Sequence, residues 1–110
     1  MLKQSDYVKI RIIAPVADAD KIREVLGREG AGVQGNYRYC SYSYRGTGRF
    51  LPGQGADPAI GEIGRLEQVD EELIEAICYV DLVEKIIQEI KKVHPYEEPA
   101  IDIMPRLEIS

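Results

Sequence analysis

The stretch from Leu82 to Val93 constrains the fold of this chain more than any other, because its pattern fits only one kind of element. Apolar side chains recur every three or four residues, with charged and amide side chains between them, as in an amphipathic α-helix with a wide apolar stripe. Asp81 is placed to cap the first turn, and Pro95 prevents the helix from continuing. Three basic side chains near its end complement the helix dipole: Lys91, Lys92 and His94.

A second helix is predicted earlier in the chain, from apolar residues that share one face. Asp18 or Asp20 can cap it, and Gly27 and Gly30 weaken and stop it. The segment Gly30–Gly35 matches the G-x-G-x-x-G dinucleotide fingerprint, but it follows a helix instead of opening one, so we interpret it as a helix end and a turn. The apolar face consists of Ile22, Val25 and Leu26.

Two stretches have the composition of strands. Tyr7–Ile13 alternates β-branched with polar or aromatic residues, and Pro15 ends it. In Tyr37–Tyr44 the tyrosines change parity after Tyr39, so large rings face both sides of this strand, or a bulge switches its faces. A strand covered on both faces in so small a domain needs a helix on one side and another subunit on the other. Oligomerisation is therefore predicted.

The segment Arg45–Gly64 is rich in glycine and proline and is predicted to be a long loop or a broken hairpin tip. Three arginines, Arg38, Arg45 and Arg49, surround the Gly-Thr-Gly turn at Thr47. Guanidinium groups and backbone amides there could bind a small anion such as a phosphate. The alternative is that these arginines are simply solvated, as isolated arginines on an exposed hairpin usually are.

The segment Leu66–Tyr79 fits two elements, and its local pattern alone favours a helix. Pro99–Ile103 can form a final strand. The order is then strand, helix, strand, middle segment, helix, strand, which becomes the split βαβ plan if the middle segment is a strand. The residues at helical spacing are Leu66, Val69, Leu73, Ile74 and Ile77.

Composition limits the class of protein. The 110 residues, 45% of them hydrophobic, are expected to form one domain over 1–110. With 14 basic against 19 acidic residues, the net charge of -5 argues against nucleic acid or an anionic membrane as a partner. No signal peptide or membrane-spanning run is evident, so we expect a cytoplasmic protein. Cys40 and Cys78 are expected to be free and mostly buried, and whether they are adjacent stays open.

The run His94–Pro99 holds the only histidine, two carboxylates and a phenol. His94, Glu97 and Glu98 could ligate zinc, copper or manganese, although one histidine per chain cannot build a tight site unless an oligomer adds further ligands. The structural alternative is a helix-end cation at His94 and ion pairs at the two glutamates. A hydrolase that also uses Tyr96 is a third possibility, but no acid, base and nucleophile form a recognisable set.

Three stretches together resemble a known pattern. They look like the CutA-like domain inserted in YqfO proteins, the bacterial members of the Ngg-one-interacting-factor-three-like family. The resemblance covers roughly Tyr7 to Leu107, and its ordered combination is specific although each piece alone is weak. The matching residues are Gly30-Ala31-Gly32 to Asn36-Tyr37 with Cys40-Ser41-Tyr42, then Gly46 to Phe50 with Gly55-Ala56 and Gly61-Glu62, then His94 to Ala100.

The resemblance implies an α+β fold, a ferredoxin-like βαββαβ sandwich similar to CutA and the PII signalling proteins, typically a trimer with its sheets facing inward. It also implies that Leu66–Tyr79 is mostly strand, against its helical spacing. In the long members this domain interrupts a larger one whose halves supply histidine and carboxylate ligands for paired metals. This chain contains neither half, so only a binding or assembly role is carried over.

We therefore expect a trimeric cytoplasmic module, regulatory or for assembly and non-catalytic, that binds a small ligand or a divalent metal in clefts between subunits. The ligand could be a small anion or a nucleotide. A small metal-dependent hydrolase and a purely structural domain for trimerisation or partner docking are the alternatives. The candidate ligand-binding residues are Arg38, Arg45, Thr47, Arg49 and Tyr96, and the candidate metal ligands are His94, Glu97 and Glu98.

Overall fold

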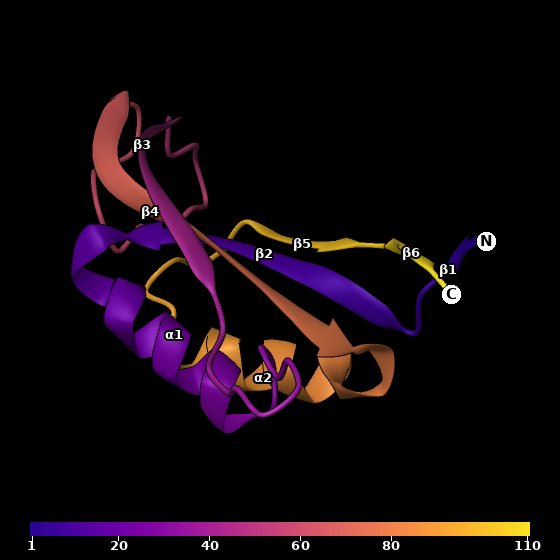
Figure 1. Cartoon of the computed structure of the whole chain (residues 1–110). Helices are drawn as coiled ribbons and strands as arrows, with labels where there is room; N and C mark the ends of the chain where they lie inside the picture. Colours follow the sequence, from indigo (N-terminus) through magenta and orange to yellow (C-terminus); the bar gives the residue numbers. More distant parts are fainter.

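The computed structural model describes residues 1–110 and shows a four-stranded antiparallel sheet with two helices on one of its faces (Figure 1). The strand order in the sheet is β3-β4-β2-β5, which is the ferredoxin-like arrangement predicted above. The elements along the chain are β2 (Tyr7–Pro15), α1 (Ala19–Arg28), β3 (Tyr42–Phe50), β4 (Glu67–Tyr79), α2 (Val83–Val93) and β5 (Ile101–Met104).

The core lies between the helices and the face of the sheet formed by the even-numbered residues of β2 and β4. The register pairs Ile10 with Ala76 and Ile12 with Ile74, so these side chains point toward the helices. Apolar side chains of this size stabilise a fold by roughly 1.5–3 kcal/mol each when fully buried. The fully buried side chains include Ile10, Ile12 and Ile74 from the sheet and Ile22, Leu26, Ile86 and Ile90 from the helices.

The opposite face of the sheet carries no helix (Figure 1). We call it the open face. It is formed by the odd-numbered residues of β2 and β4 and the even-numbered residues of β3. Leu73 of β4 lies opposite Ile13 of β2 and opposite Tyr44 of β3, and paired residues point to the same face. Two pairs of tyrosine rings lie on it, Tyr7 with Tyr79 at 5.6 Å and Tyr42 with Tyr44 at 6.2 Å between ring centroids.

The middle segment is a strand, as the family resemblance implies and against its helical spacing. β4 pairs with β2 on one side and with β3 on the other, each over nine residue pairs. A central strand that is covered on both faces carries apolar residues on both. It therefore lacks the regular alternation of a strand with one solvated face. Tertiary pairing therefore overrides the local pattern here.

The tyrosine-rich strand lies further along the chain than predicted. It begins at Tyr42 and runs to Phe50, so residues 45–50 are strand and not loop, and residues 37–41 are irregular. Tyr39 adopts a left-handed conformation with φ 61°. Its ring lies over the backbone of Gly27, where a methyl group would overlap it. Gly27 is therefore needed for packing and does not end α1, which continues to Arg28.

Both helices begin without the predicted side-chain caps. Asp81 lies inside a 3-10 turn, η2 (Val80–Leu82), and the residue that precedes α2 is Leu82. Asp18 does occupy the position before α1, at the end of the turn η1 (Val16–Asp18), but its side chain makes no capping hydrogen bond. It pairs with Lys21 at 2.9 Å instead. A preceding 3-10 turn supplies the first hydrogen bonds in each case.

A two-stranded ribbon joins the ends of the chain and was not predicted. β1 (Leu2–Gln4) pairs with β6 (Leu107–Ile109), and the ribbon extends away from the sheet (Figure 1). Neither helix is long and apolar enough to span a membrane. Both cysteines are free; Cys78 is buried as expected, whereas Cys40 is only partly buried.

Candidate functional site

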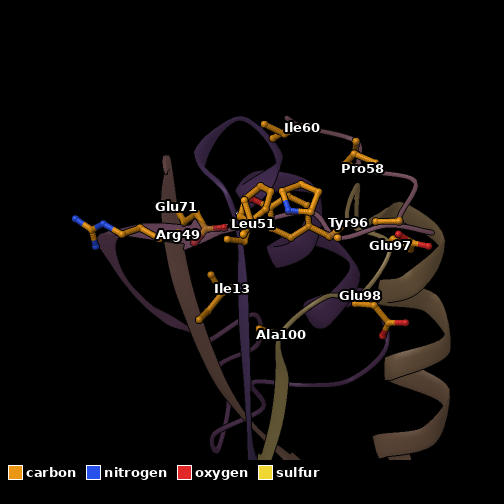
Figure 2. Close-up of a pocket in the computed structure, with 16 residues that line it drawn as sticks. Ile13, Arg49, Leu51, Pro58, Ile60, Glu71, Tyr96, Glu97, Glu98 and Ala100 are labelled. Carbon is orange, nitrogen blue, oxygen red and sulfur yellow. Dashed lines mark hydrogen bonds between the residues drawn. The ribbon is translucent and has the colours of Figure 1, made fainter. Parts of the chain in front are cut away.

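A cavity of about 520 Å³ lies at one end of the open face. Its walls come from the ends of β2 and β3, from β4, from the loop at residues 51–60 and from the segment at residues 96–100 (Figure 2). Most of its wall is apolar, and its volume lies within the range of roughly 300–1,000 Å³ that is usual for small-molecule sites. The apolar lining includes Ile13, Phe50, Leu51, Pro52, Ile60 and Ala100.

A phenol and a carboxylate meet inside this cavity. The hydroxyl of Tyr96 donates a hydrogen bond of 2.6 Å to Oε2 of Glu71, and Figure 2 shows the two side chains directed toward one another. Burial, and then the hydrogen bond to Glu71, raise the pKa of Tyr96 well above its ordinary value, so the phenol keeps its proton. Glu71 is only 8% exposed, and no cationic side chain pairs with it. The pair carries a buried negative charge.

Gly48 makes room for this carboxylate. It lies on the open face of β3, two residue pairs along from the pair Gly46–Glu71. A methyl group at Gly48 would overlap the carboxylate of Glu71. Glycine in a strand interior is unfavourable unless a close approach requires it. The approach of the Glu71 side chain supplies that requirement.

His94 does not line the cavity, but it bonds to the backbone of Tyr96, which does. Its Nε2 lies 2.7 Å from the carbonyl oxygen of Ile13, and its Nδ1 accepts a hydrogen bond of 3.1 Å from the amide of Tyr96. Because a carbonyl can only accept, Nε2 carries the proton and Nδ1 does not. The ring is neutral in this arrangement and 7% exposed. It holds Tyr96 in place, instead of facing the helix dipole as a cation.

The structure does not assemble the predicted metal ligands into one cluster. Both ring nitrogens of His94 are occupied, and no three histidine, cysteine, aspartate or glutamate side chains lie close enough to hold an ion. Glu97 accepts a hydrogen bond of 2.9 Å from the amide of Asp57, which ties the loop at 51–60 to the His94 run. Glu98 lies at the cavity rim with its carboxylate directed outward (Figure 2).

The predicted ligand-binding residues fall into three places. Arg49 and Tyr96 line the cavity, although the guanidinium of Arg49 extends away from it (Figure 2). Arg45 and Thr47 line a smaller hollow of about 190 Å³ beside it. Arg38 lies apart, with its guanidinium 5.7 Å from the ring centroid of Tyr39. The structure thus brings together only part of the predicted set.

Sequence reasoning missed Glu71, the most buried charged side chain of the cavity. It stands in the run Asp70-Glu71-Glu72, which has the composition of a solvated face. Its neighbour Glu72 points to the opposite face and pairs with Arg23 at 2.6 Å. Only the strand register, which places alternate residues on opposite faces, could have separated the two roles.

The sequence matches part of several curated bacterial proteins. A protein of Halalkalibacterium halodurans named "GTP cyclohydrolase 1 type 2 homolog" is 45% identical over 97 residues, which are 88% of this chain and 26% of that protein. A protein of the same name from Mycobacterium tuberculosis is 38% identical over 99 residues, 90% of this chain and 26% of that protein. The chain thus spans about a quarter of the length of these relatives. No family model matches it.

Solved structures agree with these matches. The crystal structure of a Bacillus cereus protein related to NIF3 superimposes with a TM-score of 0.79 at 38% identity, covering 96% of this chain and 26% of that one. The divalent cation tolerance protein CutA from Archaeoglobus fulgidus superimposes with a TM-score of 0.66 at 20% identity, covering 91% of this chain and 83% of that one. At 20% identity, the likeness to CutA shows a shared fold and nothing more.

Proposed function

We propose, from its homology to the CutA-like domain of the NIF3-related proteins, that this chain is a trimeric cytoplasmic module that binds a small ligand in a regulatory or assembly role and is non-catalytic. The observation that carries the proposal is the open face of the sheet, with the cavity at its end. Trimerisation through this face would leave the cavity beside a subunit boundary, where ligand binding and assembly can influence each other.

The open face has the side chains of an interface. An antiparallel sheet with one solvated face normally places polar residues on that face, yet here it carries two pairs of exposed tyrosines. β3 is also an edge strand, and its burial pattern shows no buried residue along its nine positions. Long exposed edges and apolar patches are typical of surfaces that associate.

Charge on the same face supports association with other copies. Arg11 lies at the centre of β2, opposite Glu75 on β4 and Asp102 on β5. Its Nε is buried without a hydrogen-bond partner, while Glu75 pairs with Lys9 at 3.5 Å. Arg11 as a whole is only partly buried, so a carboxylate of a neighbouring copy could pair with its guanidinium group.

The oligomeric state tests this proposal directly. Light scattering of the full chain at micromolar concentration should give a trimer. Tyr42→Lys places a charge on the open face and should shift the particle toward monomer. Tyr37→Lys is the matched control, because Tyr37 is as exposed, at 75% against 71%, but lies outside the sheet. A monomeric wild type, or equal effects of the two variants, would contradict the proposal.

Metal binding is a second candidate, favoured by the structural likeness to CutA proteins, which are named for divalent cation tolerance. If His94, Glu97 and Glu98 hold zinc, copper or manganese, His94 must first give up one of its two hydrogen bonds, because a metal binds through a single ring nitrogen. Metal should then raise the melting temperature of the wild type, and His94→Ala should abolish the rise. A rise that persists in the variant would exclude His94 as a ligand.

We assign no reaction to the chain. The name of the relatives refers to proteins of which this chain spans about a quarter. The hydrolase alternative needs the side chains of His94, Tyr96, Glu97 and Glu98 to converge on one reacting group. Instead, His94 bonds backbone atoms, Tyr96 bonds Glu71, and Glu97 bonds the loop. Turnover of GTP by the full chain would contradict a non-catalytic role.

A further inference from the structure

The cavity is built for one kind of ligand. We infer that it binds a small organic cation, an ammonium or guanidinium group on an apolar body, with Glu71 as the charge partner of the cationic group. This inference rests on the proposed ligand-binding role and names its ligand class. It does not depend on trimerisation, because every wall of the cavity comes from one chain.

The charge of the lining excludes anions. Two carboxylates, Glu71 and Glu97, remain at the cavity when the outward-directed Glu98 is set aside, against the single guanidinium of Arg49. That guanidinium extends away from the space (Figure 2). A phosphate or nucleotide would meet an excess of negative charge at short range in a partly apolar space, where repulsion is poorly screened. The small-anion prediction therefore does not fit this cavity.

Glu71 supplies the second, independent argument. It is more than nine-tenths buried, its hydrogen-bond partner is the neutral phenol of Tyr96, and no lysine, arginine or histidine pairs with it. Buried charges in proteins are normally paired. Its neighbour Glu72, equally buried on the opposite face, has Arg23 at 2.6 Å. A cationic ligand would form with Glu71 the ion pair that Arg23 forms with Glu72.

The remaining walls select an organic cation over a metal ion. A divalent metal needs four or more ligand atoms at short distance, and no three metal-binding side chains converge here. The rest of the lining is hydrocarbon and aromatic, with the ring of Phe50 edge-on to that of Tyr96 at 6.0 Å. Aromatic rings attract cations and cover apolar chains. An alkyl or aryl ammonium ion fits both parts of the wall.

A matched series of ligands tests the inference. 4-Phenylbutylamine, 4-phenylbutanol and 4-phenylbutyrate carry a phenylalkyl body that differs by at most one methylene group, and they differ in charge. Titrated into the ¹⁵N-labelled full chain at pH 7, the amine should bind about tenfold or more tightly than the alcohol, since hydrogen bonds to charged groups are the strong ones. The butyrate should bind more weakly than the alcohol. The amide shifts should move at Gly48, Glu71 and Tyr96.

Two variants separate charge from shape. Glu71→Gln keeps the size of the side chain and should remove the preference for the amine, while Glu84→Gln, on the exposed side of α2, should leave it unchanged. Gly48→Ala keeps every charge but occupies the space of the Glu71 carboxylate, and should weaken amine binding about tenfold or more. The ¹⁵N spectrum of each variant establishes that it is folded.

Equal binding of amine and alcohol, tighter binding of the butyrate, or a preference that survives Glu71→Gln would each overturn the inference. So would zinc or manganese chloride shifting the same amides when the amine does not. Light scattering on the same samples keeps the two proposals distinct. A trimer that does not prefer the amine refutes only the ligand class, and a monomer that prefers it refutes only the assembly.

Discussion

Replacing His94 by alanine should destabilise the protein in the absence of any metal. The change removes the donor to the Ile13 carbonyl and the acceptor for the Tyr96 amide. A buried backbone group left without a partner costs about 1–3 kcal/mol. Water could reach part of the new space, so we take the lower half of that range for each group and expect a loss of about 2–4 kcal/mol in the free energy of unfolding. That is a large share of the roughly 5–15 kcal/mol typical of a small domain.

Urea denaturation followed by circular dichroism measures this loss. With an m-value of roughly 1.5 kcal/mol/M, the midpoint should fall by about 1.3–2.7 M. Lys92→Ala, in the exposed last turn of the same helix, is the control and should change the free energy by less than about 0.5 kcal/mol. All samples are compared at one protein concentration, each with and without EDTA, because assembly and metal both shift apparent stability.

Two results would refute this reasoning. If His94→Ala costs no more than Lys92→Ala, the two hydrogen bonds at the ring do not hold the site together. If EDTA lowers the wild type to the level of the variant, the contribution of His94 passes through a metal ion. The second result would favour the ligand role predicted from the sequence over the bridging role seen in the structure.

Three further outcomes are expected. The pKa of Tyr96 is raised in the folded state, so its protonated phenol contributes stability below the unfolded value of about 10. That contribution starts to fall above about pH 10 and is lost fully only above the raised folded pKa, so the urea midpoints of wild type and Tyr96→Phe should draw together progressively from about pH 10 upward. Iodoacetamide should alkylate Cys40 at least about tenfold faster than Cys78, whose burial raises its pKa, as read by mass spectrometry. Deleting residues 1–4 and 107–110, an exposed ribbon, should cost less than about 2 kcal/mol by the same urea assay.

The parts of the fold that were predicted correctly are those in which one local pattern decides the structure. α2 has a single apolar stripe whose two central residues, Ile86 and Ile90, are fully buried. β2 alternates along its length because one face is packed under helices and the other is open. In both elements the burial of one face follows directly from the sequence period.

The strands β4 and β3 could not be predicted from a local pattern. The apolar residues of β4 include the neighbours Leu73 and Ile74, which point to opposite faces and imitate helical spacing when read along the chain. In β3, Gly46 and Gly48 suggested that the strand had ended. The strand continues because it stays paired with β4, and Gly48 is required because Glu71 of β4 lies over it. Such a cause is invisible until the register is known, and the same holds for the cavity.

A last prediction concerns the close approach of the Glu71 carboxylate to Gly48, which affects both the sheet and the cavity. Gly48→Ala should destabilise the wild type by about 1–3 kcal/mol, because the new methyl group must displace a buried carboxylate. In a Glu71→Ala background the obstacle is gone, and the same substitution should be neutral or slightly stabilising, since alanine is less costly than glycine in a strand. A double-mutant cycle by urea denaturation should therefore give a coupling of at least about 1 kcal/mol. Gly46→Ala, which faces open space on the same strand, is the control and should show none. If Gly48 and Glu71 behave additively, the carboxylate does not occupy the space that the structure gives it, and the charge partner proposed for an organic cation is lost as well.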